Sequence, residues 1–262
     1  MNNLILHIYA LCLGLCMGSF MNVLIYRLPR ELSIVRPPSH CTSCGERVRF
    51  YDNVPVFSWI FLGGKCRFCG SKISVMYPMT ELLTGFLVWY AFYRFGLSAQ
   101  FVMAVLLILT AVSAGLADLF SALDAENFEC GIIPDSLIVF GLVSALAMGY
   151  FLHHNMLFPI YGAVVGFLAL YIPSFLYKLV RKREGMGFGD VKLVAVLGAF
   201  LGLKSVFFVV FASALMGAVI GIIWQFASGK RDMMIPFGPF ISAAGLIYLF
   251  FETRMDRLLY GI

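Results

Sequence analysis

Four cysteines in two Cys-x-x-Cys pairs are the residues of this chain best suited to bind a metal. The first pair is Cys41 and Cys44, and the second is Cys66 and Cys69. A glycine follows each pair, at Gly45 and Gly70, and it allows a tight turn that directs backbone N–H groups at the sulfurs. Four thiolates at this spacing are typical of a closed, structural zinc site, and a redox or disulfide role is the alternative.

Acidic residues in two places could perform acid–base chemistry. In segment 185–193, a glycine-rich turn precedes Asp190. A second group lies further back in the chain, and its members are Asp118, Asp124, Glu126, Glu129 and Asp135. Two carboxyl groups held close share a proton, so that one activates a water while the other donates a proton, which is aspartic-protease chemistry. Taken alone, Asp190 is better explained as a helix N-cap than as a catalytic group.

Other catalytic classes lack their signatures in this sequence. The segment around Asp190 has no Gly-Lys-Ser/Thr to cradle a phosphate, so it is not a P-loop. The sequence contains neither a nucleophile elbow nor His-Glu-x-x-His, and its four histidines form no paired constellation. A serine hydrolase or a zincin-type metalloprotease is therefore not indicated.

The composition places these residues in a membrane protein. Apolar residues make up 61% of the chain and charged residues 13%, and the mean hydropathy is +0.91. We predict an all-α polytopic membrane protein with about eight transmembrane helices. The predicted spans are 3–25, 79–96, 101–122, 133–152, 157–178, 191–203, 205–226 and 235–251, of which 191–203 is short. The chain is expected to divide into a first transmembrane helix over 1–25, a zinc-binding loop domain with the four cysteines over 26–78, and a transmembrane domain that holds both acidic groups over 79–262.

The basic residues predict the orientation of the chain in the membrane. Loop 26–78 holds eight Lys and Arg residues and segment 178–192 holds five, and cytoplasmic loops retain such residues. We therefore expect the N-terminus outside and both acidic groups, like the cysteine loop, on the cytoplasmic side. Reducing conditions there disfavour disulfides and favour zinc. This bias accounts for the net charge of +5 without a nucleic-acid partner.

The motifs, in their order along the chain, resemble those of the type IV prepilin peptidases, which are bifunctional prepilin leader peptidase/N-methyltransferases. The matching segments are 18–29, the two cysteine pairs, 77–82, 133–135, 187–193 and 235–240. The resemblance implies an aspartic endopeptidase of the bacterial inner membrane whose active site faces the cytoplasm. It implies that the substrates are type IV prepilins and type II secretion pseudopilins, cut after a short basic leader. It also implies methylation of the new N-terminal amine with S-adenosylmethionine as donor.

The resemblance also assigns the catalytic residues of the peptidase. The family's Gly-x-Gly-Asp aspartate corresponds to Asp190, with Gly187, Gly189 and Lys192 beside it in supporting roles. Its expected partner is Asp124, because residues 123–126 fit the first half of the family pattern, and Asp118 is the alternative. The gap before Pro134 is a few residues longer than the family pattern, and Asp135 after it is expected to support the site. No residues are predicted for binding the methyl donor.

Three other interpretations remain open from the sequence. A channel or carrier with a zinc-held cytoplasmic gate would place its acidic residues along a path near the midplane. A non-enzymatic assembly scaffold would need the cysteine loop but would tolerate loss of Asp190. An intramembrane protease of the presenilin type shares Gly-x-Gly-Asp but does not predict the paired cysteines.

Overall fold

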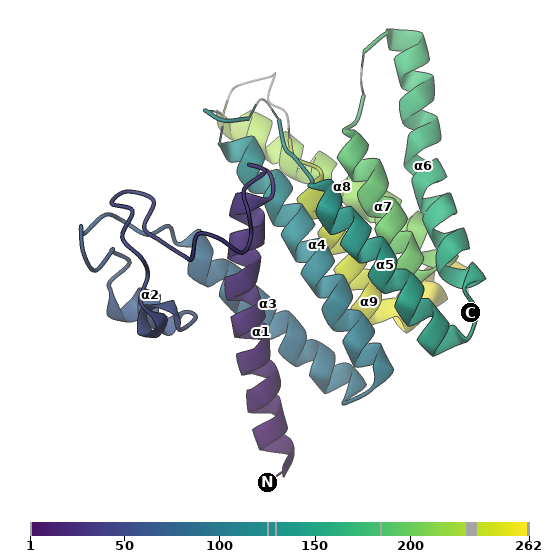
Figure 1. Cartoon of the computed structure of the whole chain (residues 1–262). Coiled ribbons are helices and arrows are strands. Elements are labelled where there is room, and N and C mark those ends of the chain that lie inside the picture. Colours follow the sequence, from purple (N-terminus) through teal and green to yellow (C-terminus); the bar gives the residue numbers. More distant parts are fainter. Residues whose placement is uncertain (1, 125, 129, 184, 229–234, 261–262) are drawn as a thin grey trace. The chain divides into compact units, whose positions relative to one another are not determined.

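The computed structural model describes residues 2–124, 126–128, 130–183, 185–228 and 235–260 (Figure 1). The elements are α1 (Asn2–Arg27), η1 (Phe50–Asn53), α2 (Phe57–Phe61), α3 (Met76–Phe95), α4 (Ala99–Leu123), α5 (Asp135–His153), α6 (Leu157–Arg181), α7 (Phe188–Leu201), α8 (Leu203–Ser228) and α9 (Gly238–Tyr260). Over the described ranges, the only β-pairing consists of two isolated bridges, so the predicted all-α class is confirmed. The chain forms two compact units, Met1–Leu97 and Ser98–Ile262.

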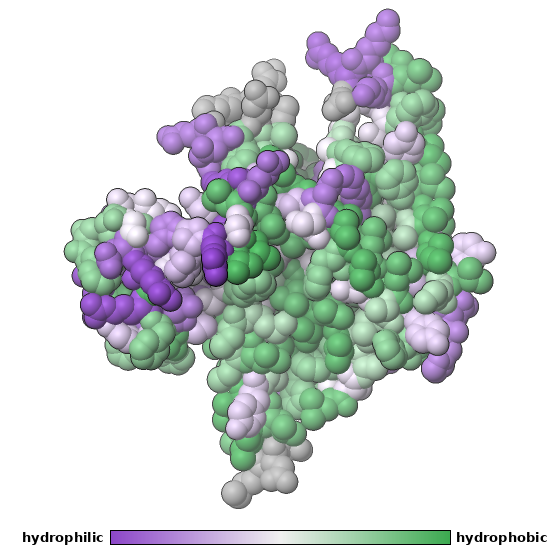
Figure 2. Space-filling model, in the orientation of Figure 1, coloured by the Kyte–Doolittle hydropathy of each residue, from purple (hydrophilic) through white to green (hydrophobic). Residues whose placement is uncertain are grey.

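Five of the described helices are long and apolar enough to cross a membrane. These stretches are Leu4–Arg27, Ala99–Leu123, Asp135–Leu152, Leu157–Arg181 and Leu203–Phe226. Large apolar side chains point outward on them, and Phe175, Phe207 and Phe211 are each more than half exposed. Hydrophobic residues cover most of the visible helix surface, and hydrophilic residues gather on the loops (Figure 2). Such a surface suits contact with lipid rather than water.

The first unit is built on two antiparallel helices that approach closely. A side chain on Gly14 of α1 would lie 2.8 Å from the Cα of Gly85 in α3, and one on Gly18 would lie 2.7 Å from the Cα of Glu81. Small residues four apart allow such close packing between membrane helices. In addition, Asn22 Nδ2 donates a hydrogen bond to the carbonyl oxygen of Tyr77. Thus α3, whose sequence we grouped with the later helices, packs on α1.

The loop between α1 and α3 is stabilised by side chains that donate hydrogen bonds to its backbone. The buried guanidinium of Arg27 donates to the carbonyl oxygens of Ser33 and Pro37, at 2.9 and 2.7 Å. Further along, Trp59 Nε1 donates to the carbonyl oxygen of Ile73. The loop contains little regular structure, only η1, α2 and the two bridges. Its shape therefore depends on such specific contacts more than on a hydrophobic core.

The second unit is organised around α7, which is short and buried. This helix packs against α4, α5, α6, α8 and α9. Of residues 190–200, all but Lys192 are buried. At about 1.5 Å per residue, its 14 residues reach only about 21 Å, which is less than the bilayer core of about 30 Å. The predicted short span is therefore a central helix enclosed by longer ones, and Asp190 lies in its first turn.

The contact between α6 and α7 depends on glycine. A Cβ atom on Gly162 would clash with the carbonyl oxygen of Gly198, a backbone atom that cannot rotate away. We therefore expect Gly162→Ala to destabilise the protein by about 3 kcal/mol, which lowers Tm by about 10 °C in detergent. Val164→Ala is the matched control, because Val164 is an exposed neighbour on the same helix. Equal melting temperatures for the two variants, measured by circular dichroism, would contradict this close packing.

Candidate active site

Asp118 is a buried carboxyl group near the end of α4. Its side chain lies in the last two turns of the helix, and the residue is only 6% exposed. The backbone N–H of Gly238, the first residue of α9, donates to Asp118 Oδ2 at 2.9 Å. A Cβ atom on Gly131 would clash with Asp118 Oδ1, and one on Gly238 would lie 2.8 Å from Oδ2. Two glycines thus let the backbone close around this carboxyl group.

Asp190 is a second buried carboxyl group, carried by the central helix. It is the third residue of α7 and 9% exposed, and its backbone N–H donates to the carbonyl oxygen of Gly187. A Cβ atom on Gly187 would lie 3.2 Å from Asp190 Oδ2, and one on Gly189 would lie 3.1 Å from Ile133 Cβ. Gly187 has a negative φ, so it serves close approach here and not a left-handed turn.

The two buried carboxyl groups lie on neighbouring helices. Asp118 belongs to α4 and Asp190 to α7, and these two helices pack against each other in the second unit. Across the part of the chain that the structure describes, neither carboxyl group forms an ion pair. A pair of carboxyl groups withdrawn from water and without a counter-charge is the arrangement that activates water in aspartic proteases.

Asp124, the partner expected from the sequence, occupies a different environment. It caps the C-terminus of α4, is half-buried, and accepts hydrogen bonds from Asn127 Nδ2 at 2.9 and 3.0 Å. These contacts are those of a residue that ends a helix. The structure places Asp118, the alternative partner, and Asp190 on helices that pack against each other. The signal for Asp118 in the sequence is its position inside the apolar run 111–120, where an ionisable residue is costly.

The remaining acidic candidates have other positions. Glu126 is exposed, and Glu129 lies outside the described residues. Asp135 is the first residue of α5, and its exposed carboxylate pairs with Lys192 Nζ of α7 at 2.6 Å. This ion pair joins α5 to α7 two residues after Asp190, which agrees with a supporting role for both residues.

The four cysteines converge in the first unit. Their sulfur atoms all lie within 4.8 Å of one another, and Cys41 Sγ is 3.9 Å from Cys69 Sγ. Four sulfurs around a zinc ion at about 2.3 Å would be separated by roughly 3.8 Å, so the group fits a tetrahedral metal site. The structure thus brings together all four predicted ligands.

Each cysteine pair lies in the same kind of turn. In the first, Gly45 N–H donates to the carbonyl oxygen of Cys41 at 2.9 Å, and in the second, Gly70 N–H donates to that of Cys66 at 3.0 Å. Both glycines have a φ near +70°, in the left-handed region that only glycine enters easily. The two glycines noted in the sequence are therefore required by the backbone.

A serine hydroxyl contacts two of the four sulfur atoms. Ser71 Oγ lies 3.5 Å from Cys41 Sγ and 3.1 Å from Cys69 Sγ. This contact, with backbone N–H groups of Cys44 and Ser43, lowers the pKa of the Cys41 thiol to about 5. Because metals bind the thiolate, a thiol that ionises readily suits a metal ligand.

Comparison with known proteins identifies both units. Residues 12–95 match the family model described as the bacterial peptidase A24 N-terminal domain, and residues 114–222 match the type IV leader peptidase family. The first match contains the cysteine group, and the second contains both Asp118 and Asp190. No solved structure matches the chain.

Curated relatives match over nearly the whole length. The prepilin leader peptidase/N-methyltransferase of Xanthomonas campestris is 36% identical over 93% of this chain and 90% of its own. The protein of the same name from Pseudomonas aeruginosa is 34% identical over 95% and 92%, and that from Neisseria gonorrhoeae is 34% identical over 91% and 88%. The predicted resemblance is confirmed. The chain therefore belongs to the type IV leader peptidase family and is related to the prepilin leader peptidase/N-methyltransferases.

Proposed function

We propose that this chain is an intramembrane aspartic endopeptidase in which Asp118 and Asp190 form the catalytic pair. The observation that carries the proposal is that two buried carboxyl groups, neither in an ion pair within the described residues, come from two helices of one unit that pack against each other. One carboxylate removes a proton from water, and the water oxygen attacks the scissile carbonyl carbon. The other carboxyl group donates a proton to the carbonyl oxygen. When the C–N bond then breaks, the leaving amine takes up a proton from the pair.

The residues around the pair have roles that follow from their contacts. The N–H of Gly238 orients Asp118, and Gly187 and Gly189 allow the backbone to pass close to Asp190 and Ile133. Asp135 and Lys192 hold α5 against α7 beside the site. These residues position the catalytic pair and take no part in proton transfer.

The proposed substrates are type IV prepilins and type II secretion pseudopilins with short basic leaders. The printed names of the relatives support prepilins as substrates. We further propose that α1 and α3–α9 provide eight membrane segments in the bacterial inner membrane, with the basic loops and the catalytic ends of α4 and α7 in the cytoplasm. Asp124 and the exposed Glu126 would then present negative charge that attracts a basic leader.

The second proposed activity is N-methylation of the newly exposed amine with S-adenosylmethionine. It is supported by the methyltransferase in the relatives' names. We propose that the cysteine group binds one structural zinc ion, because its four ligand positions are filled by protein sulfur and leave none for a substrate.

The direct test uses the purified wild-type enzyme in proteoliposomes with a prepilin that carries a basic leader. We expect a mature N-terminus from cleavage and, after addition of S-adenosylmethionine, a mass increase of one methyl group. Mass spectrometry of the product distinguishes the two activities. A substrate that stays intact would contradict the proposed peptidase and would favour a polytopic carrier or an assembly scaffold.

A further inference from the structure

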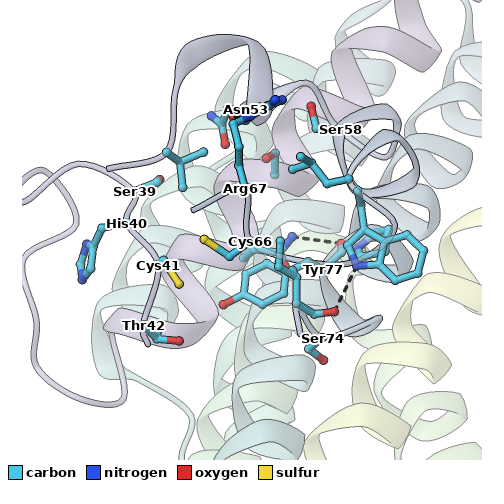
Figure 3. Close-up of a pocket in the computed structure, with 18 of the residues that line it drawn as sticks. Ser39, His40, Cys41, Thr42, Asn53, Ser58, Cys66, Arg67, Ser74 and Tyr77 are labelled. Carbon is cyan, nitrogen blue, oxygen red and sulfur yellow. Dashed lines mark hydrogen bonds and ion pairs between the residues drawn. The ribbon is translucent and has the colours of Figure 1, made fainter. Parts of the chain in front are cut away.

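The first unit contains a cavity of about 500 Å³ beneath the cysteine loop. Residues of α1, of both cysteine turns and of α3 line it, and Figure 3 shows Tyr77, Cys41 and Cys66 around the same space. Cavities of this size hold cofactors and other molecules of a few dozen atoms. The catalytic pair lies in the other unit, so the peptidase mechanism makes no use of this cavity.

A buried carboxylate lines the cavity and has no counter-charge. Glu81 is only 7% exposed, and its Oε2 accepts a hydrogen bond from Val56 N–H at 2.7 Å. Within the described ranges, Glu81 forms no ion pair. Two other charged groups of the lining are already engaged, since Arg67 pairs with Asp52 and Arg27 binds backbone carbonyls. A buried carboxylate that has hydrogen bonds but no opposite charge beside it is still costly, and a cationic ligand would offset that cost.

The other residues of the lining further restrict the kinds of ligand that the cavity can bind. The rings of Tyr26, Trp59 and Tyr77 contribute to the walls, and aromatic rings attract organic cations. Two exposed basic residues of the lining, Arg47 and Lys72, suit a carboxylate. The expected ligand is therefore a molecule with a buried cationic centre, a flat group that packs on rings, and an outer carboxylate.

We propose that this cavity binds S-adenosylmethionine, with Glu81 facing the sulfonium. The inference rests on the proposed methyl transfer and gives it a location. In that reaction the N-terminal ammonium first releases a proton to water, and the amine nitrogen then attacks the methyl carbon. The N–C bond forms as the S–C bond breaks, and the electron pair remains on sulfur in S-adenosylhomocysteine. Because this product has no charge on sulfur, Glu81 favours the donor over the product.

The test compares binding of the charged donor and the uncharged product. With the full-length enzyme in nanodiscs, equilibrium dialysis of radiolabelled ligands is expected to show wild type binding S-adenosylmethionine about tenfold or more tightly than S-adenosylhomocysteine. Glu81→Gln is expected to remove this preference by weakening donor binding alone. Glu46→Gln is the matched control, since Glu46 lines the same cavity but is exposed, and it should keep the preference. Prepilin cleavage should be unchanged in both variants.

Several outcomes would overturn the assignment, and they are distinguishable from failure of the proposed function. If the wild type binds donor and product with equal affinity, Glu81 does not distinguish the charged sulfonium from the uncharged sulfur. This conclusion holds whether or not Glu81→Gln folds. Unchanged donor binding in Glu81→Gln, in an enzyme that still methylates, places the donor elsewhere. An enzyme that cleaves prepilin but neither binds the donor nor methylates would instead remove the methyltransferase half of the proposed function.

Discussion

Asp118→Asn and Asp190→Asn are each expected to reduce prepilin cleavage by about 10³-fold or more. Asparagine keeps the shape of the side chain, and its oxygen can still accept the hydrogen bond that Gly238 N–H gives to Asp118. It cannot take or give the proton that the hydrolysis requires. Because the two groups act as a unit, the double variant should be little worse than either single variant. The rate of appearance of the mature N-terminus, followed by mass spectrometry, measures the effect.

Asp124→Asn is the control that decides between the two candidate partners. Asp124 uses its oxygens to accept hydrogen bonds from Asn127 at the end of α4, and asparagine retains an oxygen for that purpose. We expect cleavage within about threefold of wild type. The reverse pattern, an inactive Asp124→Asn beside an active Asp118→Asn, would assign the pair to Asp124 and Asp190. Cleavage that persists in Asp190→Asn would exclude the aspartic mechanism altogether.

The fold could be predicted from the sequence because its signals are local. Each long helix of the structure overlaps one predicted span, since a run of apolar residues indicates a buried or lipid-facing helix without knowledge of its neighbours. The cysteine group was predictable for the same reason, because the spacing within each pair and the following glycine specify the turn. A site whose residues all lie close together in the sequence can be predicted from that stretch of sequence alone.

The proposed catalytic partner, Asp118, could not be singled out in this way, because its environment depends on a distant contact. Asp118 is held by the N–H of Gly238, which follows 120 positions later, and it is enclosed by Gly131. Asp124 stands in a more suggestive local pattern, but that pattern produces a helix cap. Likewise, the packing of α3 on α1 depends on facing glycines, Gly14 and Gly85, from opposite sides of the loop. Contacts between residues so far apart in the sequence become known only from the three-dimensional arrangement of the helices.

Loss of the metal is expected to unfold the cysteine loop while the second unit remains intact. We predict that Cys41→Ser/Cys66→Ser loses bound zinc and becomes sensitive to trypsin, which has sites at Arg47 and Arg49. The physical reason is that this loop contains only one 3-10 turn, one five-residue helix and two isolated bridges. A structural zinc site contributes on the order of 10 kcal/mol or more, and this loop has little else to replace it. Metal analysis and limited proteolysis measure the two effects.

The same variant connects the metal to the proposed methyl-donor cavity. Cys41 and Cys66 line that cavity, so an unfolded loop should abolish binding of S-adenosylmethionine along with zinc. Cys12→Ser/Cys16→Ser is the matched control, since these cysteines lie on α1 outside the sulfur group and should leave zinc and donor binding unchanged. Chelation of the wild-type enzyme should reproduce the effect of Cys41→Ser/Cys66→Ser. If the chelated loop instead resisted trypsin and still bound the donor, the metal would not be what maintains this part of the fold.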